Sequence, residues 1–197
     1  MGQDLDFATL IGSRICHDLI SPIGAINNGI ELLEMSTSSA GPEMSLISES
    51  VSNASARIRF FRIAFGAAGG ESIGRPEVVS ILNDVYTGSR MSVAWGPLQG
   101  IPRRIVRLSF LAVMCLETAM PYGGRVEITE DGDHILLTAI ADKMKIDSDL
   151  WGLMETAQTR QDLRPAHVQF GLLPVVAESE TRALEISTSE TRITIRI

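Results

Sequence analysis

The chain has 197 residues and a mass of 21.4 kDa, with 45% hydrophobic and 21% charged residues, which is the composition of a globular protein. A disordered chain and a coiled-coil rod are therefore excluded, and no apolar run of about 18 residues suggests a membrane span. The net charge of −7 argues against general affinity for nucleic acid. Two cysteines in apolar stretches and the absence of a signal-like N-terminus predict a reduced, cytoplasmic protein.

The N-terminal part, residues 1–70, predicts two long helices joined by a turn. We expect the first helix from about residue 5 to 35, a turn at 36–42 and the second helix from 43 to about 68. Apolar residues on the second helix recur at alternating intervals of three and four, as in helical bundles. This seam comprises Met44, Ile47, Val51, Ala54, Ile58, Phe61 and Phe65.

A hairpin of two such helices cannot bury both of its apolar stripes by itself. Pairing with a second copy into a four-helix bundle would bury them, so a homodimer is predicted. The residues expected in its core are Ile47, Val51, Ile58 and Phe61.

After a linker expected at 71–76, residues 77–197 predict an α/β sandwich with a mixed sheet. The predicted helices span 77–86, 103–120, 148–157 and 168–178. A single strand is expected at 91–95, and two hairpins pair 125–129 with 134–141 and 182–187 with 192–197. Together with the helical hairpin, this organisation predicts an α+β protein.

The most informative motif is the run ICHDLISPI, in which an acid and a leucine follow His17 and a proline comes five residues after it. At about 100° per residue, the apolar residues of this helix fall on the side opposite His17. That stripe comprises Ile11, Ile15, Leu19, Pro22, Ile26, Ile30 and Leu33. His17 is therefore expected to face solvent, with Ser21, Gly24 and Asn28 on its own side.

Other chemistry-bearing residues give weaker signals. His134 follows a turn and His167 begins a helix, and no pair of histidines or cysteines has metal-ligand spacing. No glycine-rich loop ends in Gly-Lys-Ser/Thr. Cys115 lies in an apolar predicted helix and is expected to be a core residue. We predict no metal and no cofactor of its own.

The His17 motif resembles the H-box of two-component histidine kinases, and the second half resembles their Bergerat-type ATP-binding domain. In this resemblance the magnesium-binding asparagine would fall at Cys115. Asp142 stands where an Asp-x-Gly-x-Gly loop is expected, but both glycines are missing, and Gly171 alone is left of the second glycine-rich box. The resemblance therefore implies a degenerate domain that does not bind ATP.

An H-box hairpin followed by an α/β sandwich that lacks nucleotide-binding motifs resembles the ChpT family of alphaproteobacterial histidine phosphotransferases. The resemblance implies a homodimer with His17 as phosphoacceptor. Its donor would be the receiver domain of a hybrid cell-cycle kinase, and its acceptors response regulators of the CtrA and CpdR type, with Mg²⁺ held by the receiver. Asp18 would orient the imidazole or help to deprotonate it; a solvated surface role for Asp18 stays open.

In an antiparallel hairpin, His17 should lie level with about Phe60 of the second helix. The predicted docking surface for a receiver comprises Arg14, Ser21, Gly24, Asn28, Arg57, Phe60 and Ala64 around His17. A packing or bending role for Gly24 beside Pro22 is the alternative for that residue. For the whole chain, a divergent ATP-dependent kinase core and a dimeric scaffold with a vestigial histidine remain alternatives.

Overall fold

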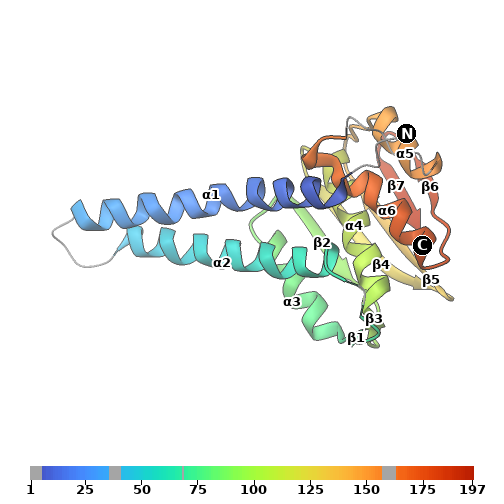
Figure 1. The fold of residues 1–197 in the computed structure, drawn as a ribbon, viewed down its shortest axis with the longest axis horizontal. Coiled ribbons are helices and arrows are strands. Elements are labelled where there is room, and N and C mark those ends of the chain that lie inside the picture. Colours follow the sequence, from blue (N-terminus) through green and yellow to red (C-terminus); the bar gives the residue numbers. More distant parts are fainter. Residues whose placement is uncertain (1–5, 36–40, 68, 157–162) are drawn as a thin grey trace.

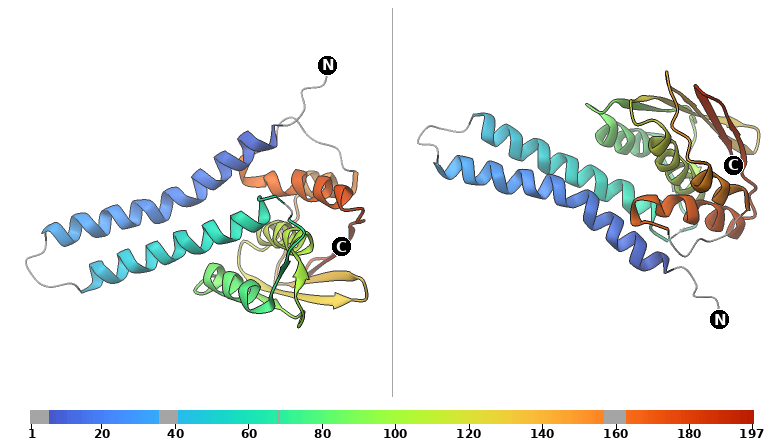
Figure 2. Two further views of the ribbon diagram at one scale, coloured as in Figure 1. Left: turned by 60° about the horizontal axis from the view of Figure 1, so that its bottom comes forward. Right: turned by 90° about the horizontal axis from the view of Figure 1, so that it is seen from above.

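The computed structural model describes residues 6–35, 41–67, 69–156 and 163–197. Helices α1 (Phe7–Met35) and α2 (Pro42–Ala64) lie side by side as an antiparallel hairpin that projects from a helix-and-sheet body (Figures 1 and 2). Residue 5, where the first helix was predicted to begin, and residues 36–40 of the predicted turn lie outside the described residues, and α1 begins at Phe7. α2 ends at Ala64 rather than near 68, and the chain then turns so closely at Gly66 that a side chain there would meet the carbonyl oxygen of Arg62.

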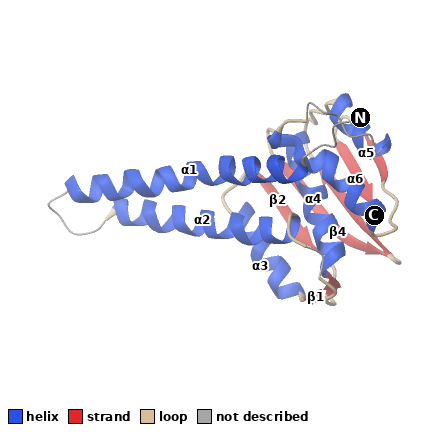
Figure 3. Ribbon diagram, viewed as in Figure 1, coloured by secondary structure: helices blue, strands red, loops and turns tan. Residues whose placement is uncertain are grey.

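The body contains a five-stranded mixed sheet in the order β2-β4-β5-β7-β6, with helices packed against it (Figure 3). β2 pairs parallel to β4, and the other neighbours pair antiparallel. The predicted α+β class with a mixed sheet is thereby confirmed. The strands are β2 (Met91–Trp95), β4 (Gly124–Asp131), β5 (His134–Ile140), β6 (Glu185–Thr188) and β7 (Arg192–Arg196). The helices are α3 (Arg75–Tyr86), α4 (Arg103–Ala119), α5 (Ser148–Thr156) and α6 (Val168–Ser179), with a 3-10 turn, η1 (Pro165–His167), before α6.

The segment 71–76, predicted as a linker, is part of the folded body. It contains β1 (Ser72–Ile73), which pairs antiparallel with β3 (Ile101–Pro102), and α3 begins inside it at Arg75. The amide of Arg103 also donates a hydrogen bond to the carbonyl of Glu71. Strands of two residues are too short to show an apolar alternation, which is why the sequence did not reveal them.

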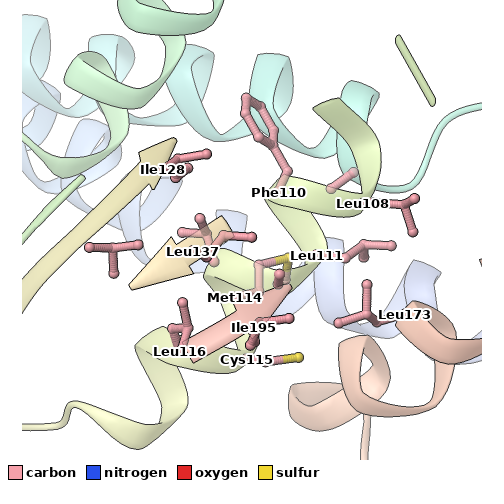
Figure 4. Packing of buried hydrophobic residues seen from close by; sticks show 14 of the residues in the cluster. Leu108, Phe110, Leu111, Met114, Cys115, Leu116, Ile128, Leu137, Leu173 and Ile195 are labelled. Carbon is pink, nitrogen blue, oxygen red and sulfur yellow. The ribbon is translucent and has the colours of Figure 1, made fainter. Parts of the chain in front are cut away.

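The core is built around α4, whose side chains from Phe110 to Leu116 are all buried. In Figure 4, Met114 and Cys115 of α4 lie beside Ile195 of the sheet, and Leu111 faces Leu173 of α6. A helix with apolar residues on nearly all sides is one that is covered on nearly all sides. Among the described helices, none is long and apolar enough to cross a membrane.

The C-terminal half of α2 belongs to the same core. Phe60 stacks on Phe110 of α4 with 4.5 Å between ring centroids, and Ala64 is completely buried. Both had been predicted to be exposed docking residues, and that prediction is wrong. α2 carries a second apolar line at Ala56, Phe60 and Ile63, because this half of the helix packs against the body as well as against α1.

Towards the turn, the two hairpin helices bury less apolar surface than predicted. A side chain at the buried Gly29 would meet Ile47 Cγ1 at 2.6 Å, so the glycine allows α1 and α2 to approach closely. Ile47 is accordingly half-buried, and Phe61 is buried. Val51 and Ile58, predicted in the dimer core, are about half exposed in the single chain, and Ile30, predicted on the buried stripe, is 42% exposed. Apolar contacts within one chain therefore leave part of the hairpin uncovered.

Phe60→Ala tests whether the contact between α2 and α4 holds the hairpin against the body. Removing a buried phenylalanine ring should lower the free energy of unfolding by about 3–5 kcal/mol. Urea denaturation at fixed protein concentration measures this change. Leu98→Ala, at a residue that is 75% exposed, is the matched control and should change it by less than about 0.5 kcal/mol. Equal effects of the two variants would contradict the assigned contact.

Candidate functional site

His17 lies in the middle of α1, and its side chain is 79% exposed, as the helical geometry predicted. Its Nδ1 atom lies 3.0 Å from Oδ1 of Asp18. A carboxylate accepts hydrogen bonds, so this contact assigns the ring proton to Nδ1. The other nitrogen, Nε2, then carries the lone pair and can act as a nucleophile.

Asp18 is held among charged groups, and its side chain is only 11% exposed. Arg14 Nε donates to its Oδ2 atom at 2.8 Å, and Arg57 Nη1 of α2 lies 3.9 Å from the same oxygen. The solvated surface role considered for Asp18 is therefore wrong. Its burial and contacts fit the alternative of a carboxylate that orients the imidazole, which remains a prediction.

Arg14 connects the histidine helix to the body. Besides its bond to Asp18, its guanidinium donates to the backbone carbonyl of Ala166 in η1. Only 15% of the Arg14 side chain is exposed. Arg14 is thus bonded within the chain to Asp18 and Ala166, and only a small part of its side chain could contact a docked receiver.

The other residues predicted around His17 differ in their exposure. Ser21 and Asn28 are exposed, and Arg57 retains 40% of its side-chain exposure. A side chain at Gly24 would meet no atom within 4 Å, so no packing contact within the chain requires a glycine there. With Phe60 and Ala64 buried, the exposed large apolar residue nearest to His17 along α1 is Ile20, at 69% exposure, which was not among the predicted docking residues.

Two further residues beneath Asp18 were not found from the sequence, Tyr86 at the end of α3 and Glu117 in α4. The Tyr86 hydroxyl donates to Glu117 Oε2 at 3.3 Å. Desolvation by the surrounding helices raises the pKa of Glu117, although the residue is exposed to solvent on its outer side. Burial and the charge of Glu117 raise the pKa of Tyr86 well above its usual value. Their proximity to Asp18 arises only from the packing of the body on the hairpin, so no local sequence signal could reveal it.

Two of the three places that resemble nucleotide-binding motifs are packed into the core, whereas Asp142, at the third, is exposed. Cys115, at the asparagine position, is completely buried, and its burial raises the pKa of the thiol. A side chain at Gly171 would meet Leu163 Cδ2 at 2.8 Å and Phe7 Cε1 at 3.3 Å, so close apolar packing explains this glycine. Among the residues that the structure describes, no group of three His, Cys, Asp or Glu could hold a metal ion.

Comparisons with known proteins agree with this arrangement. The family model described as "Histidine phosphotransferase C-terminal domain" matches residues 75–192. The chain belongs to this family. Protein phosphotransferase ChpT of Brucella abortus (strain 2308) is 40% identical over 131 residues, which make up 65% of this chain and 62% of the Brucella protein. The match thus spans less than two thirds of that relative.

A solved structure described as a bacterial phosphotransferase is similar over the whole chain. It is 31% identical, with a TM-score of 0.81, and the alignment covers 100% of this chain and 97% of the other. The hairpin with His17 is therefore part of the shared fold, together with the body that the family model matches.

Mg-ATP should not bind to the intact chain, because Cys115 stands buried where the magnesium-binding asparagine is expected and Gly171 is filled by apolar packing, which leaves Asp142 alone at the motif positions. Calorimetric titration into the protein should give no heat of binding up to millimolar nucleotide. A dissociation constant in the micromolar range would contradict this expectation and would revive the ATP-dependent kinase alternative.

Proposed function

We propose that the protein is a histidine phosphotransferase of a bacterial two-component phosphorelay. The observation that carries the proposal is the exposed His17, whose Nδ1 is engaged by Asp18 and whose Nε2 faces solvent. The membership of its family and the name of the Brucella relative support the same activity.

The chemistry needs few groups on this chain. The Nε2 lone pair of His17 attacks the phosphorus of an aspartyl phosphate, and the bond between phosphorus and the aspartate oxygen breaks as the carboxylate leaves. Asp18 accepts a hydrogen bond from Nδ1–H and so stabilises the positive charge that develops on the ring. Transfer to the next receiver reverses these steps, with its aspartate as nucleophile.

The partners that we propose follow the family resemblance. The phosphoryl donor is the receiver domain of a hybrid histidine kinase, and the acceptors are response regulators of the CtrA and CpdR type in cell-cycle control. Mg²⁺ belongs to the receiver, where it neutralises the phosphoryl charge, and this chain needs no cofactor. Such partners place the protein in the cytoplasm.

We also propose that the protein acts as a homodimer through the hairpin. Met44, Val51 and Ile58 follow each other on α2 at intervals of seven residues and are 45%, 46% and 51% exposed. On α1, Ile23 and Ile30 repeat the same spacing and are 50% and 42% exposed. Intervals of seven keep a stripe facing one partner along two helices. A second copy would cover both stripes in a four-helix bundle.

His17→Ala should abolish acceptance of labelled phosphate from a phosphorylated receiver, because His17 is the proposed nucleophile. Its side chain is exposed, so the melting temperature should change by less than about 2 °C. His134→Ala serves as the control and should keep the label. Label on the His17→Ala protein would disprove the assignment. Absence of label on the native protein with any receiver would favour the scaffold alternative.

Ile58→Asp should yield a folded monomer, measured by light scattering and circular dichroism. The residue is 51% exposed within one chain, so the charge disturbs no core of its own. In the dimer the carboxylate would be buried without a partner, which costs several kcal/mol. Leu98→Asp, at another exposed apolar residue, should leave the mass in solution unchanged. An intact dimer of the Ile58→Asp protein would exclude the proposed interface.

A further inference from the structure

A small cavity beneath Asp18 lies where α1, α2, α3 and α4 meet. Its polar lining consists of Arg14 and Asp18 of α1, Arg57 of α2, Tyr86 of α3 and Glu117 of α4. His17 points away from this cavity into solvent, so its link to the body runs through Asp18. The phosphotransfer chemistry described above uses neither Tyr86 nor Glu117.

The guanidinium groups of Arg14 and Arg57 line the same small cavity as the carboxylates of Asp18 and Glu117. Arg14 Nε binds Asp18 Oδ2 at 2.8 Å, whereas Arg57 Nη1 remains 3.9 Å from that oxygen, beyond hydrogen-bond length. Glu117 is attracted by both arginines and repelled by Asp18. Because Arg57 lines one cavity with both carboxylates, it is attracted to Glu117 as well as to Asp18.

Tyr86 fixes the position of Glu117. Its hydroxyl donates to Glu117 Oε2 at 3.3 Å, and its raised pKa keeps it protonated and able to donate. The Tyr86 ring is held in turn by an edge-on contact with Phe60, at 6.4 Å between ring centroids. Glu117 is thus supported by groups that belong to the packed junction of hairpin and body.

We propose that Glu117 and Tyr86 are positioning residues for His17 that act through Arg57 and Asp18. This inference rests on the proposed phosphotransfer at His17 and deepens it. Glu117 draws Arg57 away from Asp18. The negative charge on Asp18 Oδ1 is then not reduced by Arg57, and this oxygen accepts a strong hydrogen bond from the imidazole Nδ1–H.

Loss of the Glu117 charge has a defined consequence for His17. Arg57 then closes on Asp18 and takes a share of the carboxylate charge. The hydrogen bond from Nδ1–H to Asp18 weakens, because its acceptor is less negative. The ring loses part of its preference for the tautomer with the proton on Nδ1, and Nε2 is less often the free nucleophile.

Glu117→Gln is the direct test, because it removes the charge and keeps the shape of the side chain. In ¹⁵N spectra of the unphosphorylated protein, the fraction of His17 with the proton on Nδ1 should fall. The rate of label transfer at saturating phosphorylated receiver should fall about threefold, while the receiver concentration at half saturation stays the same. A merely structural role for Glu117 would leave the tautomer unchanged.

Three further variants sharpen the test. Tyr86→Phe should change the tautomer in the same direction by a smaller amount, and it keeps the proposal testable should Glu117→Gln fail to fold. Glu127→Gln removes the partner of Arg125 on the sheet and, as the matched control, should change neither readout. In an Arg57→Gln background, Glu117→Gln should have no further effect on the tautomer.

The outcomes separate this inference from the proposed function. An unchanged His17 tautomer in both Glu117→Gln and Tyr86→Phe overturns the inference, whatever the transfer rates are. An equal effect of Glu117→Gln with and without Arg57 also overturns it, because the action would not pass through that residue. Failure of the native protein to accept phosphate on His17 refutes the proposed function, while the tautomer spectra still report on Glu117.

Discussion

The packing of α2 against α4 is the contact on which the arrangement at His17 depends. Phe60 stacks on Phe110, and the guanidinium groups of Arg103 and Arg107 of α4 donate to the carbonyls of Arg62 and Ala64 at the end of α2. These bonds satisfy carbonyls that a helix end leaves unpaired. α2 is therefore fixed on the body by apolar contact and by its own C-terminus, and Arg57 is carried to Asp18 as a result.

The charges near His17 are balanced before any phosphoryl group arrives. The two positive charges of Arg14 and Arg57 equal in number the two carboxylates of Asp18 and Glu117. Of the two arginines, only Arg57 is substantially exposed. A phosphoryl group on Nε2 would add about two negative charges close to Asp18. Arg57, at 3.9 Å from Asp18 Oδ2, can move towards that charge without leaving Asp18 unpaired, since Arg14 remains bonded to it. The same geometry that orients the imidazole thus limits the repulsion that phosphorylation would cause.

The sequence predicted the hairpin, the mixed sheet and the outward direction of His17, because each follows from local periodicity. The ion pair of Arg14 with Asp18, four residues apart on one helix, was also within reach of sequence reasoning. The burial of Phe60 and Ala64 does not follow from the seam that faces α1 and a second copy, because Ala56, Phe60 and Ile63 form a second apolar line on α2. Glu117 and Tyr86 were beyond prediction, since only the tertiary packing of α3 and α4 brings them under Asp18.

The apolar packing at Cys115 and Gly171 gives a physical reason for a body that resembles an ATP-binding domain without its motifs. At Gly171, Phe7 of α1 and Leu163 lie where a Cβ atom would stand, so the body contacts the histidine helix at its start as well as through η1 and Arg14. A domain that delivers phosphate from its own ATP must be able to approach the histidine. A body anchored to both helices of the hairpin instead fixes the position of the histidine helix, and the His17 side chain is left exposed to solvent. A fixed, exposed histidine suits the proposed function, in which the phosphoryl group comes from a separate receiver domain.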